Sequence, residues 1–219
     1  MRKGYQLAYQ LACEELGNID DIEQLCFRSG ASYQVIDSKR TIALEYLNRP
    51  YQVTLPDIEI SLEDSEEEVP LVDKILILHY LLQAKGTPLS NKMIGYKELP
   101  GGSVYVPTFT KRAIKPIIEH FGKEPDRLVD VAAVIGGRKA DYGDVAVTID
   151  AFSRVPIMLV LWRGDEEFPP EAKFIFDSTI SDYLTTDDVN AVCGIIAWKL
   201  VRLLKSASQD GAQASRGAI

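Results

Sequence analysis

The sequence is poor in cysteine, which excludes the common cysteine-based sites. Its three cysteines are Cys13, Cys26 and Cys193, and none of them belongs to a CxxC pair. An odd number of cysteines without paired spacing provides no disulfide framework. Cys13 and Cys26 lie among apolar positions, so we expect them to be small buried residues rather than metal ligands. This cysteine usage is typical of a protein in a reducing cytoplasm.

The sequence also lacks an excess of positive charge and any long apolar run. Its net charge is −8 and its pI is about 4.9, so it offers no basic face to a nucleic acid or an anionic membrane. No run approaches the ~18 apolar residues of a membrane span, and residues 1–16 lack the apolar core of a signal peptide. We therefore expect a soluble cytoplasmic protein with no nucleic-acid partner and no membrane span.

Catalytic sequence motifs are missing as well. The chain contains no P-loop, dinucleotide-binding fingerprint, GxSxG elbow or HExxH motif. The nearest feature is the glycine and basic cluster 136–139, followed by Gly143 and Asp144. A helix C-cap that leads into a strand explains these glycines better than a phosphate cradle does. The motifs therefore leave open whether the protein is an enzyme.

The first half of the chain is patterned as helices, then strands, then a helix. Leucine spacing predicts helices over 4–17 and 19–29. Short β-branched and aromatic runs over 31–63 predict an antiparallel meander of about four strands. The acidic run 63–68 is expected to be a solvated loop. The apolar residues of 70–86 predict a helix buried on nearly every side.

The second half is predicted to alternate between helices and strong strands. The segment before residue 108 is loop-rich, and Tyr105 with Pro107 suggests a short extended piece. Pro116 is expected to shorten or kink the helix that contains it. The strand VPIMLVLW is apolar throughout, so we expect it to be central in its sheet. The predicted elements are helices over 111–121, 125–135 and 185–205 and strands over 144–152, 155–163 and 172–177.

This order of elements predicts an α+β fold with one or two antiparallel sheets and segregated helices. We expect a single domain over 1–205, with two subdomains that meet near 69–90 as the alternative. The small polar residues of 206–219 predict a disordered tail.

The turn LWRGDEEFPPEAKFIFD carries a cluster of carboxylates after an apolar strand. In the structural interpretation, which we favour, Arg163 pairs with Asp165, Glu167 or Asp177. A metal site would need several of these carboxylates, with Glu166 and Glu171, to converge on an ion. The turn has no nearby histidine and no calcium-loop spacing, so we predict no metal here. A pair of carboxylates for acid–base chemistry stays an alternative.

His79 lies in the apolar run LILHYLLQ and is followed by Tyr80. A lone histidine on an apolar helix is commonly a hydrogen-bonded core residue. The alternative is that it faces a ligand, as an axial ligand of haem or a corrinoid or as an acid–base group. His120 lies near a helix C-terminus, where a cation suits the helix dipole.

Three strings carry a family resemblance: LHYLLQAKGTPL, YKELPGGSVYVPTF and LVLWRGDEEFPPEAKFIFDSTISDYLTTDDV. With them the chain, from about Tyr5 to Leu204, resembles an uncharacterised domain-of-unknown-function family of anaerobic bacteria and archaea. Some members of that family are fused to an iron–sulfur domain like that of corrinoid-linked one-carbon enzymes. The resemblance implies work near corrinoids or iron–sulfur clusters. Because this chain has no four-cysteine cluster, an iron–sulfur role would belong to a partner protein.

We therefore expect a cofactor-binding or accessory protein of anaerobic metabolism that binds a tetrapyrrole, either a corrinoid or haem. The expected cofactor-binding residues are His79, Tyr80, Tyr96, Tyr105 and Trp162.

Two other classes of function stay open. One is a carboxylate-based enzyme, possibly metal-dependent, that uses Asp165, Glu167 and Asp177 with Arg163 as the orienting group. The other is a non-catalytic module whose acidic run 63–68 steers a basic partner.

Overall fold

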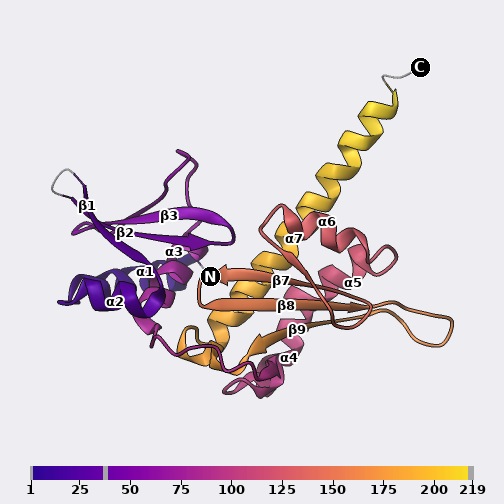
Figure 1. The fold of residues 1–219 in the computed structure, drawn as a ribbon, viewed down its shortest axis with the longest axis horizontal. Coiled ribbons are helices and arrows are strands. Elements are labelled where there is room, and N and C mark those ends of the chain that lie inside the picture. The colour runs from indigo at the N-terminus through magenta and orange to yellow at the C-terminus, as the bar shows by residue number, and fades with distance from the viewer. Residues whose placement is uncertain (1, 37–38, 217–219) are drawn as a thin grey trace. The chain divides into compact units, whose positions relative to one another are not determined.

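The computed structural model describes residues 2–36 and 39–216 (Figure 1). The chain divides into two compact units, each described here by itself. Unit 1 consists of Met1–Met93, Asp150–Pro156 and Asp177–Val189, and unit 2 consists of Ile94–Ile149, Ile157–Phe176 and Asn190–Ile219.

The structure confirms the α+β class, with helices and two separate antiparallel sheets. The α-helices are α1 (Arg2–Gly17), α2 (Ile22–Ser29), α3 (Leu71–Gln83), α4 (Gly102–Phe109), α5 (Lys115–Phe121), α6 (Arg127–Ala133) and α7 (Thr186–Arg216). The strands are β1 (Ser32–Ile36), β2 (Lys39–Tyr46), β3 (Arg49–Leu55), β4 (Glu59–Leu62), β5 (Met93–Gly95), β6 (Arg138–Ala140), β7 (Val145–Phe152), β8 (Val155–Trp162) and β9 (Glu171–Asp177). Short 3-10 helices occur at η1 (Tyr96–Glu98) and η3 (Ser178–Asp182), and η2 (Thr110–Ile114) is a π-helical turn.

The sheet of unit 1 is the predicted meander. Its strand order is β1-β2-β3-β4, and each strand is antiparallel to the next. The residues that face the core are in register, since Ile42 pairs with Val53 and Val53 with Ile60, and all three are at most 3% exposed. Helices α1, α2 and α3 lie together on one side of this sheet (Figure 1). Alternation of apolar residues therefore placed the core face correctly.

Helix α3 is buried on nearly every side, as predicted. Ile77 and Leu78 are fully buried, and Tyr80 is 1% exposed. The ring of Tyr80 stacks on Phe152 at 4.0 Å between centroids with an interplanar angle of 7°. The helix ends at Gln83 rather than at Gly86. Gly86 has a φ of +78° and lies in the following turn, where a residue without a side chain is favoured.

The other sheet has the order β5-β9-β8-β7-β6, so β8 is central as its uninterrupted apolar sequence predicts. Leu159, Val160 and Leu161 are fully buried on consecutive positions, which places apolar contacts on both faces of the strand. In unit 2, Ile196 and Leu200 on α7 are also fully buried.

The prediction of an extended piece at Tyr105 and Pro107 is wrong, because these residues lie within α4. Burial decides this conformation: Phe109 is 4% exposed, and its ring stacks on Tyr96 at 3.9 Å. The helical path then continues through η2, and the N–H of Lys115, the first residue of α5, donates to the Thr110 carbonyl. This wider turn lies directly before Pro116, whose missing N–H is thereby accommodated.

Helix α7 begins after Thr185, as predicted, and extends to Arg216, past the expected end at residue 205. Residues 217–219 of the expected tail lie outside the described residues. Among the helices of the described chain, none combines the length and the apolar character that a bilayer crossing requires.

Candidate functional site: the His79–Asp188 pair

The side chains of His79 and Asp188 form a hydrogen-bonded pair within unit 1. His79 lies in the second half of α3, and Asp188 lies in the first turn of α7, 109 residues later. The distance from His79 Nδ1 to Asp188 Oδ1 is 2.8 Å. The side chain of Asp188 is 8% exposed and that of His79 is 28% exposed. The carboxylate is thus enclosed, while the imidazole keeps one accessible side.

Asp188 is held in place by the cap of α7. Thr185 Oγ1 donates to Asp188 Oδ2 at 2.6 Å. Thr185 N also donates to Asp188 Oδ2, at 3.2 Å, and Asp188 N donates back to Thr185 Oγ1 at 3.1 Å. This reciprocal pattern is a capping box, with an aspartate in the position that glutamate usually takes. Because one carboxylate oxygen is committed to the cap, the other has a defined position from which it orients the imidazole.

The interaction between the two side chains shifts the pKa of each one so that its charged form is favoured. The hydrogen bond to Asp188 raises the pKa of His79 above 6.5, Glu15 adds to the increase, and burial opposes it. Burial raises the pKa of Asp188, but hydrogen bonds from His79 and Thr185 outweigh it and lower the pKa below 3.8. An imidazolium–carboxylate pair is therefore favoured in the folded state.

We predict that this pair makes folding stability depend on pH near neutrality. A histidine whose folded pKa is raised stabilises fully below its ordinary pKa of 6.5, and the stabilisation is lost as pH rises through the folded value. Urea unfolding from about pH 5.5 to about pH 8.5 measures the slope. In Asp188→Asn the loss of stability with rising pH should be much smaller than in wild type, whereas His120→Gln should keep it. Equal slopes in wild type and Asp188→Asn would contradict the assignment.

Tyr80, the neighbour of His79 in the sequence, points into the core of unit 1. Its hydroxyl donates to the Ser29 carbonyl and lies 3.3 Å from Ser153 Oγ. Burial raises the pKa of Tyr80 to about 12. The structure therefore gives Tyr80 core partners on both its ring and its hydroxyl.

The other three aromatic candidates belong to unit 2 and have separate neighbours there. Tyr96 is 5% exposed and stacks on Phe109, whereas Tyr105 on α4 is 45% exposed. Trp162 at the end of β8 has Lys173 Nζ 5.0 Å from its ring centroid. This distance is that of a cation–π contact.

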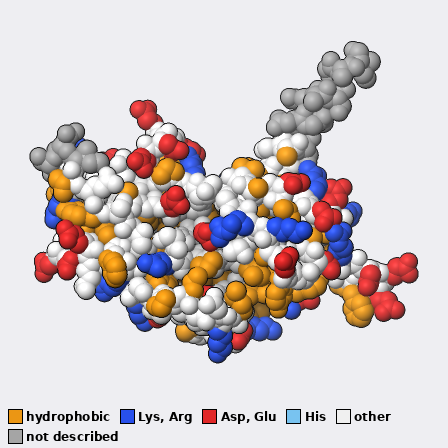
Figure 2. All heavy atoms as spheres, in the orientation of Figure 1, with side chains coloured by type: hydrophobic (Ala, Val, Ile, Leu, Met, Phe, Trp, Pro, Cys, Tyr) orange, Lys and Arg blue, Asp and Glu red, His pale blue; other side chains and the backbone are white. Residues whose placement is uncertain are grey.

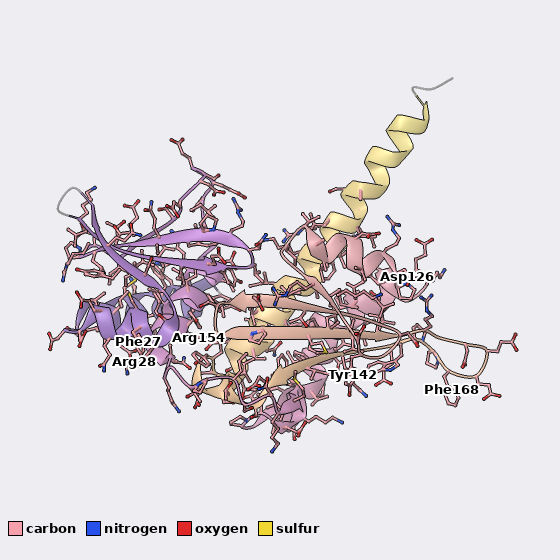
Figure 3. All side chains as sticks on the ribbon, viewed as in Figure 1. Phe27, Arg28, Asp126, Tyr142, Arg154 and Phe168 are labelled. Atoms are coloured by element: carbon pink, nitrogen blue, oxygen red, sulfur yellow. The ribbon has the colours of Figure 1, made fainter. Side chains whose placement is uncertain are left out.

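The carboxylate-rich turn after β8 is largely a solvent-exposed loop. Red acidic side chains stand out on this loop in Figure 2, and Phe168, which is labelled at the loop in Figure 3, is 66% exposed. Asp165 Oδ1 accepts the backbone N–H groups of Glu167 at 2.9 Å and Phe168 at 2.7 Å, which closes a tight turn. Glu167 is exposed.

Arg163 pairs with Asp126, at 2.7 Å, rather than with any of the three carboxylates expected from the sequence. Its backbone N–H donates to Asp144 Oδ2 at 2.7 Å. Strand β8 ends at Trp162. The alternation of side-chain direction along the strand, on which the predicted pairing of Arg163 relied, therefore does not extend to Arg163.

Asp177 is 5% exposed and organises a loop in unit 1. It accepts hydrogen bonds from the backbone and hydroxyl of Ser90 and of Thr179, and from the backbone of Asn91. Burial raises the pKa of Asp177, but the hydrogen bonds from Thr179 and Ser90 prevail and lower it to about 2. All of these contacts are to the protein itself, which is typical of a structural carboxylate.

Asp188 is the residue of this site that sequence reasoning missed. The spacing Thr185-x-x-Asp188 indicates a helix cap, and the lone histidine on an apolar helix indicates a special position. Neither pattern predicts that the side chains of His79 and Asp188 are in contact. Within the described residues, no group of three or more His, Cys, Asp or Glu side chains could hold a metal ion, so His79 is a single imidazole donor.

Comparison with known proteins places the chain in one family. No curated protein and no solved structure gives a significant match. A family model described as "Domain of unknown function (DUF3786)" matches residues 21–198, a range that includes both His79 and Asp188. Because the match covers most of the sequence, the chain belongs to the DUF3786 family.

Proposed function

We propose that this protein binds a tetrapyrrole, a corrinoid or haem, and that His79 would hold its metal through Nε2. The observation that carries the proposal is the 2.8 Å hydrogen bond between His79 Nδ1 and Asp188. In the neutral imidazole this bond keeps the proton on Nδ1 and leaves the lone pair on Nε2. Metal-binding histidines commonly have this arrangement, in which a carboxylate fixes the tautomer and raises the basicity of the ligand.

A tetrapyrrole suits a site with one imidazole better than a bare metal ion does. A bare ion in a protein usually takes three or more side-chain ligands, and the described residues contain no cluster of that kind. The ring nitrogens of a tetrapyrrole already fill four positions of the metal, so a single histidine completes the attachment. The donor set present at His79 therefore fits this class of cofactor.

In this proposal the chain positions the cofactor, and the bound group supplies the redox or group-transfer chemistry of its metal. Asp188 orients the imidazole and, through its negative charge, makes it a stronger donor. Thr185 keeps the carboxylate in place through the cap of α7. The protein would act as an accessory of anaerobic metabolism, beside an iron–sulfur or corrinoid protein partner, as the family resemblance implies.

Titration of the purified protein with haem and with cobalamin tests the proposal. We expect one of the two to bind, with a shift of its absorption bands that is absent in His79→Ala. Asp188→Asn should weaken binding by about 10- to 100-fold, the usual effect of losing a carboxylate behind a metal-bound histidine.

His120→Ala is the matched control, because His120 is the other histidine of the chain and its Nδ1 lies 3.0 Å from the Pro116 carbonyl. This variant should bind like the wild type. The proposal is wrong if neither compound changes its spectrum with wild-type protein, or if His79→Ala gives the same change.

A further inference from the structure

We propose that Arg28 and Arg154 form an oxyanion-binding site in unit 1 that takes the phosphate or carboxylate group of a small molecule. The proposal is independent of tetrapyrrole binding, since it uses other residues. Figure 3 shows both arginines, one at the end of α2 and the other in the turn between β7 and β8.

Arg28 carries the first observation. Its Nε atom is buried, and among the residues that the structure describes it has no hydrogen-bond acceptor. A buried guanidinium N–H without an acceptor is uncommon, because the lost hydration is then not replaced. The side chain lies against Gly86, where a Cβ atom would come within 3.2 Å of Arg28 Cγ. The arginine is therefore packed in position rather than free in solvent.

Arg154 approaches the same place from the β7–β8 turn. A Cβ atom on Gly30 would lie 3.3 Å from Arg154 Nε and 2.7 Å from Ser153 Oγ. Gly30 has a φ of +70° and caps α2 directly after Ser29. A side chain at residue 30 would thus collide with the two groups that the turn presents, and glycine leaves room for them.

The turn after α3 has Arg28 as a direct neighbour and has Arg154 as a neighbour through Tyr183. Arg28 packs on Gly86, and the next residue, Thr87, accepts a hydrogen bond from the hydroxyl of Tyr183. Arg154 lies close enough to this hydroxyl to lower the pKa of Tyr183, although burial outweighs the effect. Arg28 therefore packs on the segment 86–87 through the stem of its side chain, and Arg154 lies near the tyrosine whose hydroxyl donates to the same segment.

The nearby carboxylate does not neutralise this charge. Asp182 Oδ1 pairs with Lys85 Nζ at 2.8 Å, and Asp182 Oδ2 accepts from Thr87 Oγ1 at 2.8 Å. Within the described part of the chain, neither Arg28 nor Arg154 has an ion pair with a carboxylate. A bound oxyanion would provide the counter-charge that neither guanidinium group finds among the described carboxylates.

The chemistry of these groups indicates the class of ligand. Guanidinium groups match the oxygen spacing of phosphate and carboxylate and bind both through charge-assisted hydrogen bonds. The hydroxyl of Ser153 lies beside Arg154 but already donates to the Ser29 carbonyl at 3.1 Å, so the two arginines are the donors of this site. The arrangement is that of a small anion site at the surface and not of a nucleic-acid face, which would need a wider basic area.

Calorimetric titration with inorganic phosphate and with acetate, at constant ionic strength, tests this site. We expect wild-type protein to bind one of the two anions, and this result identifies the ligand group. Arg28→Gln and Arg154→Gln should each weaken that binding at least ~10-fold. His79→Ala should bind the anion like the wild type, so failure of this site and failure of the tetrapyrrole site are distinguishable.

Arg40→Gln is the matched control, because Arg40 is an exposed arginine of the same unit on β2 and the substitution changes the net charge equally. It should leave anion affinity unchanged. The proposal is overturned if wild-type protein binds neither anion at ~10 mM, if Arg28→Gln and Arg154→Gln bind like the wild type, or if Arg40→Gln loses affinity to the same extent. Circular dichroism of each variant confirms that the fold is retained.

Discussion

Tyr80→Ala is expected to lower the free energy of unfolding by about 3–5 kcal/mol, the cost of removing a large aromatic side chain from a core. The ring of Tyr80 is 1% exposed and stacks on Phe152, which in turn stacks on Tyr46 at 4.9 Å. Alanine leaves a cavity beside the ring of Phe152 and removes the stacking contact. Urea unfolding followed by circular dichroism measures the change.

Tyr80→Phe separates the contribution of the ring from that of the hydroxyl. It should cost only about 1 kcal/mol, because the Ser29 carbonyl keeps a second donor, Ser153 Oγ at 3.1 Å. Tyr105→Ala is the control for an exposed tyrosine and should change stability by less than about 0.5 kcal/mol. If Tyr80→Ala were as stable as wild type, Tyr80 would not be a core residue, and a direct role in ligand binding would regain support.

Asp177→Ala is expected to cost about 2–3 kcal/mol, because the substitution removes the charged acceptor of several partly buried donors. The carboxylate accepts from the backbone N–H of Asn91 at 2.7 Å, of Thr179 at 3.0 Å and of Ser90 at 3.1 Å. Alanine cannot accept any of these bonds. The measurement is the midpoint and slope of urea unfolding at pH 7.

Acid unfolding gives an independent measure of the role of Asp177. Its pKa in the folded protein is about 2, against an ordinary value of 3.8. A carboxyl group with a lowered folded pKa stabilises above its ordinary pKa, and this stabilisation is lost as pH falls through the folded value. Wild-type stability should therefore fall between about pH 4 and about pH 2 more steeply than that of Asp177→Asn.

Asp165→Asn is the matched control for Asp177, because both carboxylates accept backbone N–H groups but Asp165 lies in an exposed turn. Its cost should stay below about 1 kcal/mol. A larger effect at Asp165 than at Asp177 would reverse the structural interpretation of these two residues and restore the turn after β8 as a candidate site.

Local sequence patterns were sufficient to predict the secondary structure of segments in which the burial of apolar side chains is the dominant effect. Apolar alternation placed the strands from β1 to β4, and the unbroken apolar run placed β8 at the centre of its sheet. The same reasoning failed at α4, where Tyr105 and Pro107 suggested a short extended piece. There the burial of Phe109 against Tyr96 outweighed the local preference, and that contact is not visible in a window of neighbouring residues.

The candidate site likewise has some features that the sequence predicts and others that depend on tertiary contacts. The sequence by itself determined that His79 stands alone among apolar residues of a helix and that the last helix begins near Thr185. Only the tertiary structure decided that Asp188 is the partner of His79, that Arg163 pairs with Asp126, and that Arg28 packs on Gly86. The physical reason is separation along the chain. Propensity and periodicity act over a few residues, whereas each of these pairings depends on how distant elements pack.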